Sequence, residues 1–435
     1  MLRPTLRERF LETFGFSRLV ATNIRVKAVS ELIVKAGRVL LVIVAARVLG
    51  PEGFGLYAFA FAFGSILANA SDFGLQMFLS REVARAESPR AAVLGQAIRA
   101  KLGLTGCVLL LLAAAFFFYP RPIEDRAFVV LLTLVALLHS WNELWNYFFR
   151  GIQSLREEAW LNILNMVVGT GLGILLLVGG KGITGLGIGL LAAEALTCMV
   201  ALGLLRRHAG FAERAIEAPA GKAIREAAPI GIAILLSILY FRINVLFLER
   251  MKGDEVVGAY SAAYKILESF MFLPAVFLAA LFPAFAEATR RNLDQMRRVY
   301  RNSLRWMLLL ATGIVAGSLL LAQPGLRLLY GSAYAGAVPV LRTLSPAILF
   351  IFLNYALTHF LVALGGQKWN AIFAGACVLV NVCLNLALIP SLGGIGAAIA
   401  TVATEGILFA LCFATVRKRL ARHEEGWSAA AGGMA

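Results

Sequence analysis

The sequence predicts an all-α polytopic membrane protein with twelve transmembrane helices, arranged as two six-helix lobes related by a pseudo-twofold axis along the membrane normal. Three observations lead to this fold class. The 435 residues are 60% hydrophobic and only 15% charged, whereas soluble domains carry about 25% charged residues. Several apolar runs reach the ~20 residues that a helix needs to cross a bilayer. Related motifs recur at offsets of 203 and 211 residues.

The apolar runs are expected to be helices, because lipid offers no hydrogen-bond partners to open strand edges and the runs lack the alternation of barrel strands. The predicted spans are residues 28–49, 54–79, 93–119, 127–149, 158–179, 183–206, 223–249, 256–285, 299–322, 338–364, 369–390 and 395–416. The predicted regions are an N-terminal segment (1–27), an N-lobe (28–206), a linker (207–222), a C-lobe (223–416) and a disordered tail (417–435). Segment 1–27 is compatible with an interfacial amphipathic helix or a disordered basic tail.

The distribution of positive charge predicts the orientation of these spans. The net charge is +16, and the basic residues cluster at the ends of spans rather than along one exposed stripe, which argues against nucleic-acid binding. The N-terminal segment, the C-terminal tail and the loops on the same side of the membrane contain 26 Lys and Arg. The loops on the opposite side contain 6. Both termini are therefore expected in the cytoplasm of a bacterium, with the protein in its inner membrane.

An internal repeat joins the two predicted lobes. Gly55-Leu-Tyr57 follows the first span and Gly258-Ala-Tyr260 follows the seventh, while Gly182-Ile-Thr-Gly185 matches Gly393-Gly-Ile-Gly396 before the sixth and twelfth spans. Because each repeat holds an even number of spans, the two halves share one topology in the membrane.

Charged side chains deep in the spans predict a substrate site in a central cavity. Glu31, Lys35 and Arg38 share one face of the first span, and Arg38 lies about 15 Å into it. The repeat places Arg242 at the equivalent position of the seventh span, and Lys265 follows in the eighth. Arginine suits phosphate because its planar fork binds pairs of oxygen atoms. In the alternative interpretation, these cations only form ion pairs with buried acids such as Glu31, Asp72 and Glu268.

Further polar stripes are candidates for cavity lining or for coupling. Asn69 and Asp72 lie on the second span, His139 and Glu143 on the fourth, and Glu268 follows Lys265 on the eighth. Mixed donors and acceptors suit sugar hydroxyls, but helices in membranes also use such groups to bind one another. A proton relay at His139 is the weaker hypothesis. Glu194 and Glu405, at repeat-related positions, are expected to be structural.

The sequence predicts no metal site and no cofactor, and it leaves proton or sodium coupling open. None of the five cysteines has the spacing of metal ligands. An enzyme is not expected, because the longest predicted outer segment, residues 323–337, has no Asp or Glu. A membrane glycosyltransferase or polymerase would need such acidic groups outside the bilayer.

The C-terminal half resembles a known transporter family. The residues that carry the resemblance are Gly366-Gln-Lys368, Asn381, Asn385, Leu388-Ile-Pro390, Gly396-Ala-Ala398 and Glu405, together with the segments 47–57 and 281–285 of the earlier chain. They are similar to those of the polysaccharide transporter (Wzx-like lipid-linked oligosaccharide flippase) family, within the multidrug/oligosaccharidyl-lipid/polysaccharide exporter superfamily.

This resemblance implies a flippase that moves an undecaprenyl-diphosphate-linked oligosaccharide to the outer leaflet by alternating access. Its expected partners are the polyprenyl-diphosphate-linked oligosaccharide and the lipid bilayer, with a polysaccharide polymerase and glycosyltransferases as further candidates. Two alternatives stay open within the superfamily, a cation-coupled multidrug antiporter and a peptidoglycan-precursor flippase.

Overall fold

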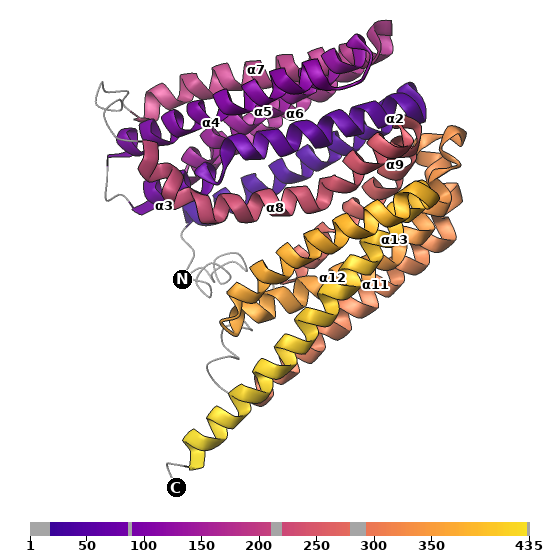
Figure 1. Cartoon of the computed structure of the whole chain (residues 1–435). Helices are drawn as coiled ribbons and strands as arrows, with labels where there is room; N and C mark the ends of the chain where they lie inside the picture. The colour runs from indigo at the N-terminus through magenta and orange to yellow at the C-terminus, as the bar shows by residue number, and fades with distance from the viewer. Residues whose placement is uncertain (1–17, 86–88, 210–219, 279–292, 433–435) are drawn as a thin grey trace, which may run out of the picture. The chain divides into compact units, whose positions relative to one another are not determined.

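The computed structural model describes residues 18–85, 89–209, 220–278 and 293–432 (Figure 1). Most of the predicted interfacial segment, most of the linker and the end of the eighth span lie outside the described residues. The described residues are helical apart from short connections, and eight of the helices are long and apolar enough to cross a membrane.

The first of two compact units comprises residues up to Val48 and Phe63–Leu235. Within it, α5 and α6 pack against α7, and α3 packs against α4 and α5 (Figure 1). This unit contains both ends of α2 (Arg18–Asp72), up to Val48 and from Phe63 onward, and the first half of α8 (Ala220–Lys252). Its other elements are α3 (Leu75–Arg85), α4 (Arg90–Phe118), α5 (Ile123–Gly151), α6 (Leu155–Leu176), the π-helical turn η1 (Leu177–Lys181) and α7 (Gly182–Ala209).

The second unit comprises Leu49–Ala62 of α2 and the chain from Leu236 onward. Helix α12 lies at its centre, because it packs against α9, α11 and α13. Besides the segments of α2 and α8, this unit contains α9 (Asp254–Phe270), α11 (Leu293–Tyr330), the 3-10 turn η3 (Ser332–Tyr334), α12 (Ala337–Ala363) and α13 (Gln367–Gly432).

Glycines with positive φ divide the helices at repeat-related positions. Gly50 (φ 67°) and Gly253 (φ 82°) are 203 residues apart, and Gly182 (φ 57°) and Gly393 (φ 56°) are 211 apart. Glycine adopts this conformation without the steric penalty that a Cβ atom would impose. The breaks at Gly50 and Gly393 lie inside α2 and α13, so each of these helices contains two spans. With these breaks, the described part of every predicted span is largely helical, and the all-α membrane fold is confirmed.

Two element boundaries differ from the predicted ones. The predicted span 54–79 breaks at Phe73 and Gly74, both with positive φ, and α3 begins afterwards. A Cβ atom on Gly74 would lie 2.7 Å from the Ala227 carbonyl oxygen, so the break allows α8 to approach closely. Helix α13 continues to Gly432, past the predicted start of a disordered tail at residue 417. Its last turns are rich in Ala, Arg and Glu, which favour helix.

A close helix contact in the second unit involves the glycines that revealed the repeat. A Cβ atom on Gly55 would lie 1.8 Å from the Asp254 carbonyl oxygen, and one on Gly258 would lie 1.8 Å from that of Pro51. The second segment of α2 and helix α9 therefore touch, backbone to backbone, at their N-terminal ends. Only residues without a side chain permit this approach.

Candidate functional site

Helix α2 presents a charged face in the first unit. Glu31, Lys35 and Arg38 share one face of this helix, as their spacing predicts. All three are exposed. The Glu31 carboxylate lies 3.1 Å from the Lys27 ammonium group, one turn earlier. Within the described part of the chain, Arg38 has no ion pair. The Arg38 guanidinium is therefore presented towards lipid or a water-filled space rather than buried against an acid.

His139 and Glu194 form a half-exposed pair in the same unit. His139 Nδ1 lies 2.9 Å from Glu194 Oε1, and the His139 side chain is 48% exposed. Asn142 donates from Nδ2 to the Glu194 backbone oxygen (2.9 Å) and to Oε2 (2.7 Å). Glu143 accepts a 2.9 Å bond from Asn146. Most of these bonds run between α5 and α7, so they fasten helices while leaving one face of His139 accessible.

Asp72 lies in a buried ion pair that the sequence analysis did not identify. Lys101 Nζ is 3.0 Å from Asp72 Oδ1 and donates to Ser140 Oγ at 2.8 Å, and the Lys101 side chain is 0% exposed. Asp72 is therefore already neutralised inside the unit and is poorly placed to line a wet cavity. Neighbouring Asn69 donates to the Ser65 carbonyl one turn earlier. The missed signal was the depth of Lys101 in its span, since a buried cation requires a partner.

The second unit contains a cluster of two cations, one acid and one aromatic ring. Arg242 Nη2 lies 3.6 Å from Glu268 Oε1, and Lys265 Nζ is hydrogen-bonded to Glu268 Oε2. Both cations also lie over the ring of Phe61, with Arg242 at 5.3 Å and Lys265 at 5.9 Å from its centroid. The structure thus brings together three of the predicted site residues. The Glu268 carboxylate is shared by these two cations.

The hydrogen bonds around Glu405 repeat those around Glu194. Asn354 Nδ2 donates to the Glu405 backbone oxygen (3.0 Å) and to Oε2 (2.8 Å), as Asn142 does to Glu194. The remaining carboxylate oxygen accepts from the Tyr240 hydroxyl at 2.8 Å, where the first unit has His139. This pattern supports the expected structural role of both glutamates, with a histidine partner in the first unit and a tyrosine partner in the second.

A second polar network in this unit consists of amides and hydroxyls. Asn244 donates to the hydroxyls of Tyr260 and Thr401, both at 2.9 Å, and accepts from Asn385 at 2.7 Å. Asn385 also donates to the backbone and side-chain oxygens of Asn381, both at 2.8 Å. All five side chains are buried. They fasten α8, α9 and α13 to one another rather than face a ligand.

Another ion cluster surrounds Glu158, which the sequence analysis also missed. The buried Glu158 carboxylate binds both Lys27 and Arg150. Burial opposes the charged form of Lys27, but the hydrogen bond and charge of Glu158, assisted by Glu31, outweigh it and raise the pKa of Lys27. The cluster connects α2, α5 and α6 and has a structural role.

No metal centre is present among the described residues. The described residues contain no group of three or more His, Cys, Asp or Glu that could hold a metal ion, and the five cysteines are free thiols.

Comparisons with known proteins agree with this architecture. The family model described as polysaccharide biosynthesis protein matches residues 20–289, and the MatE model matches residues 229–387. A probable low-salt glycan biosynthesis flippase, Agl15 of Haloferax volcanii, is 25% identical over 82% of this chain and 75% of its own length.

Two solved structures are similar in fold. An inward-facing multidrug resistance MATE family transporter of the MOP superfamily has a TM-score of 0.75 at 20% identity, covering 89% of this chain and 95% of its own. The lipid II flippase MurJ, in an inward closed conformation, has a TM-score of 0.69 at 14% identity, covering 91% and 88%. These findings confirm the resemblance identified from the sequence. The chain belongs to the polysaccharide biosynthesis protein family, and it is a multi-pass membrane protein with the fold of transporters of the multidrug/oligosaccharidyl-lipid/polysaccharide exporter superfamily.

Proposed function

We propose that this chain moves an undecaprenyl-diphosphate-linked oligosaccharide from the cytoplasmic to the outer leaflet of a bacterial inner membrane. The product would serve the synthesis of a cell-surface polysaccharide such as O-antigen or exopolysaccharide. The observation that carries the proposal is the cluster of Arg242, Lys265 and Glu268 within the membrane-spanning helices. Placing a charge there costs at least ~2.5–3.5 kcal/mol on insertion scales, and two cations held around one accessible carboxylate suit an anionic ligand.

The geometry of this cluster suits a diphosphate. Arg242 is 19% exposed and Glu268 is 37% exposed, so a ligand has access to both. At 3.6 Å, the Arg242–Glu268 contact is too long for a good hydrogen bond, and the guanidinium keeps donors for a phosphate. Lys265 donates a hydrogen bond to the other carboxylate oxygen of Glu268. This positive charge weakens the repulsion between the carboxylate and an anionic ligand. Arg38, the repeat-related counterpart of Arg242, is proposed as a second phosphate contact.

The remaining polar groups have separate proposed roles. His139 is a candidate for proton coupling, because its ring is half exposed and adjoins Glu194. Both termini are proposed to lie in the cytoplasm, on the basis of the bias in Lys and Arg. A polysaccharide polymerase and glycosyltransferases are proposed as partners, since the substrate must be made on one side and consumed on the other. A peptidoglycan precursor also carries a diphosphate, so the glycan itself must be tested.

The test is a translocation assay with the purified full chain in vesicles. A fluorescent undecaprenyl-diphosphate oligosaccharide is placed in both leaflets, and its accessibility to an external lectin or glycosidase is followed over time. We expect protein-dependent translocation of this lipid that an organic cation does not inhibit. Protein-dependent export of a fluorescent organic cation, with no movement of the glycolipid, would show a drug antiporter instead. Faster movement of lipid II than of the oligosaccharide lipid would favour a peptidoglycan-precursor flippase.

A further inference from the structure

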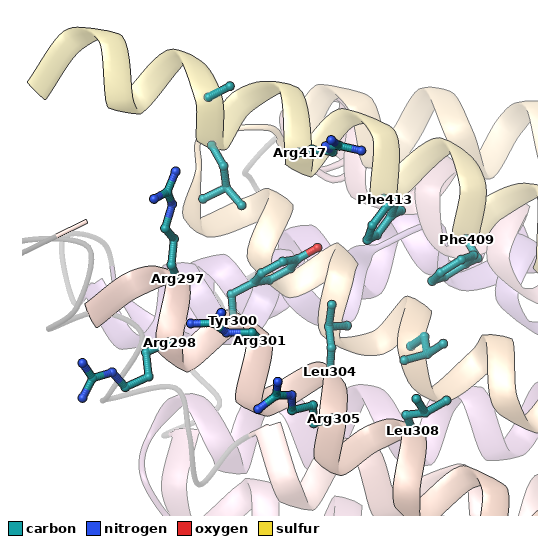
Figure 2. Close-up of a pocket in the computed structure, with 13 residues that line it drawn as sticks. Arg297, Arg298, Tyr300, Arg301, Leu304, Arg305, Leu308, Phe409, Phe413 and Arg417 are labelled. Atoms are coloured by element: carbon teal, nitrogen blue, oxygen red, sulfur yellow. The ribbon is translucent and has the colours of Figure 1, made fainter. Parts of the chain in front are cut away.

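A groove on the second unit lies between α11 and α13, with α12 contributing to its floor (Figure 2). Its volume is about 950 Å³, at the upper end of the ~300–1,000 Å³ range of small-molecule pockets. The residues that line it are Arg297, Arg298, Tyr300, Arg301, Leu304, Arg305, Leu308, Leu353, Phe409, Phe413, Arg417, Leu420 and Ala421. None of these residues belongs to the candidate substrate site described above.

One end of the groove is strongly basic. Four of its arginines belong to the N-terminal part of α11, and Arg417 lies on α13 (Figure 2). All five arginines are exposed, and the lining contains no Asp or Glu. The lining therefore offers guanidinium groups to a phosphate and contains no carboxylate of its own.

The other end of the groove is apolar. Leu304 and Leu308 lie on α11, while Phe409 and Phe413 project from α13 towards them (Figure 2). The two phenyl rings are stacked, with centroids 5.7 Å apart. Leu308 is 44% exposed, so this surface is presented to lipid rather than buried in the unit. The groove thus offers a charged end followed, along the helix axes, by a surface that suits a hydrocarbon chain.

Tyr300 also lines the groove, and its hydroxyl group lacks a hydrogen-bond partner among the described residues. The hydroxyl is buried, and the ring packs edge-on against Phe360 at 4.7 Å. An unsatisfied buried hydroxyl carries a cost in free energy, because it has lost its hydrogen bonds to water. A ligand oxygen in the groove would remove that cost.

The depth of the groove in the bilayer follows from its neighbours. Trp306, next to the last arginine of the α11 cluster, is 60% exposed, and tryptophan is enriched at membrane–water interfaces. The predicted orientation places the N-terminal end of α11 on the cytoplasmic side. Basic pockets between transmembrane helices on that side bind anionic lipid headgroups.

We propose that this groove binds an anionic phospholipid of the cytoplasmic leaflet, with the phosphate at the arginines and one acyl chain along Leu304, Leu308, Phe409 and Phe413. The chemistry of the lining selects this occupant over the glycolipid substrate. Guanidinium groups donate hydrogen bonds and accept none, so they suit phosphate oxygens. Sugar hydroxyls require acceptors as well, and Tyr300 supplies the only side-chain acceptor in the lining. The site is therefore a lipid site separate from the transport path.

The test measures lipid binding to the full chain in detergent by native mass spectrometry. Phosphatidylglycerol, cardiolipin, phosphatidylethanolamine and undecaprenyl diphosphate are added separately. We compare the wild type with a triple variant, Arg298→Gln, Arg301→Gln and Arg305→Gln. The matched control removes three exposed cations outside the groove, through Lys222→Gln, Lys368→Gln and Lys418→Gln. With about a fivefold effect for each basic residue, the triple variant should bind both anionic phospholipids about 100-fold more weakly, and the control should be nearly unchanged.

A second variant examines the apolar end without changing the charge. Phe413→Ala should weaken binding of a long-chain phosphatidylglycerol and leave binding of a short-chain form unchanged. Three results would overturn the proposal. The first is equal binding of phosphatidylethanolamine and the anionic lipids, and the second is an equal loss of lipid affinity in the triple variant and its control. The third is tighter binding of undecaprenyl diphosphate that competes for the same arginines. The last result would make the groove part of the substrate path.

Discussion

Replacing Arg242 with glutamine separates a role in substrate binding from a role in stability. If Arg242 served only to neutralise Glu268, its removal would strand a buried acid and cost about 3–5 kcal/mol. The structure argues against this outcome. Glu268 keeps its hydrogen bond to Lys265 and is 37% exposed, so it remains neutralised and solvated in the variant.

The expected magnitudes follow from the same contacts. The Arg242–Glu268 contact is long and partly exposed, which limits it to below about 1 kcal/mol. The contact with the Phe61 ring adds about 0.5–1 kcal/mol. The free energy of unfolding should therefore fall by less than about 2 kcal/mol. Loss of a charged hydrogen bond to phosphate should cost about 1.5–3 kcal/mol of binding, which is about 10- to 150-fold in affinity.

The assay measures glycolipid translocation and thermal stability on the same preparations. Arg242→Lys keeps the charge without the planar fork and should be intermediate in transport. Arg250→Gln, the same change on an exposed arginine eight residues later on α8, is the matched control and should transport normally. A folded Arg38→Gln, Arg242→Gln double variant with normal translocation would refute the proposed phosphate contacts. Strong unfolding of Arg242→Gln alone would instead support a structural role.

Three further outcomes are expected. Lys101→Met should lower the free energy of unfolding by about 3–5 kcal/mol because it strands Asp72, whereas adding Asp72→Asn should restore most of it; no recovery in the double variant would contradict the buried pair. Gly55→Ala should destabilise the protein by about 1–3 kcal/mol and impair transport, because its Cβ would overlap the Asp254 carbonyl. Gly313→Ala, which meets no atom within 4 Å, should be tolerated, and equal effects of the two changes would rule out this contact. A cysteine at Lys222 should react with a membrane-impermeant reagent only from the cytoplasmic side, and labelling of intact cells from outside would overturn the predicted topology.

The sequence by itself determined the membrane class, the number of spans and the repeat. These features can be read from consecutive residues, since a run of about 20 apolar residues is long enough to cross the bilayer as a helix. Repeat motifs such as Gly55 and Gly258 were visible as residue identities, and the structure shows why they are glycines. The deep cations Arg38 and Arg242 were also recognisable, because a charged residue within an apolar run is visible in the sequence alone.

The tertiary structure decided which charges neutralise one another. Asp72 and Lys101 are 29 residues apart in the chain, and no spacing rule connects them, so Asp72 looked available for a ligand until the packing of α2 and α4 was known. The same reasoning applies to Glu158, which binds cations from two other helices. The basic groove combines Arg417 with arginines of α11 that are more than 100 residues earlier in the chain. Helix packing brings distant residues within a few ångströms, and the hydrophobic pattern of each helix specifies which face is buried but not which neighbour it meets.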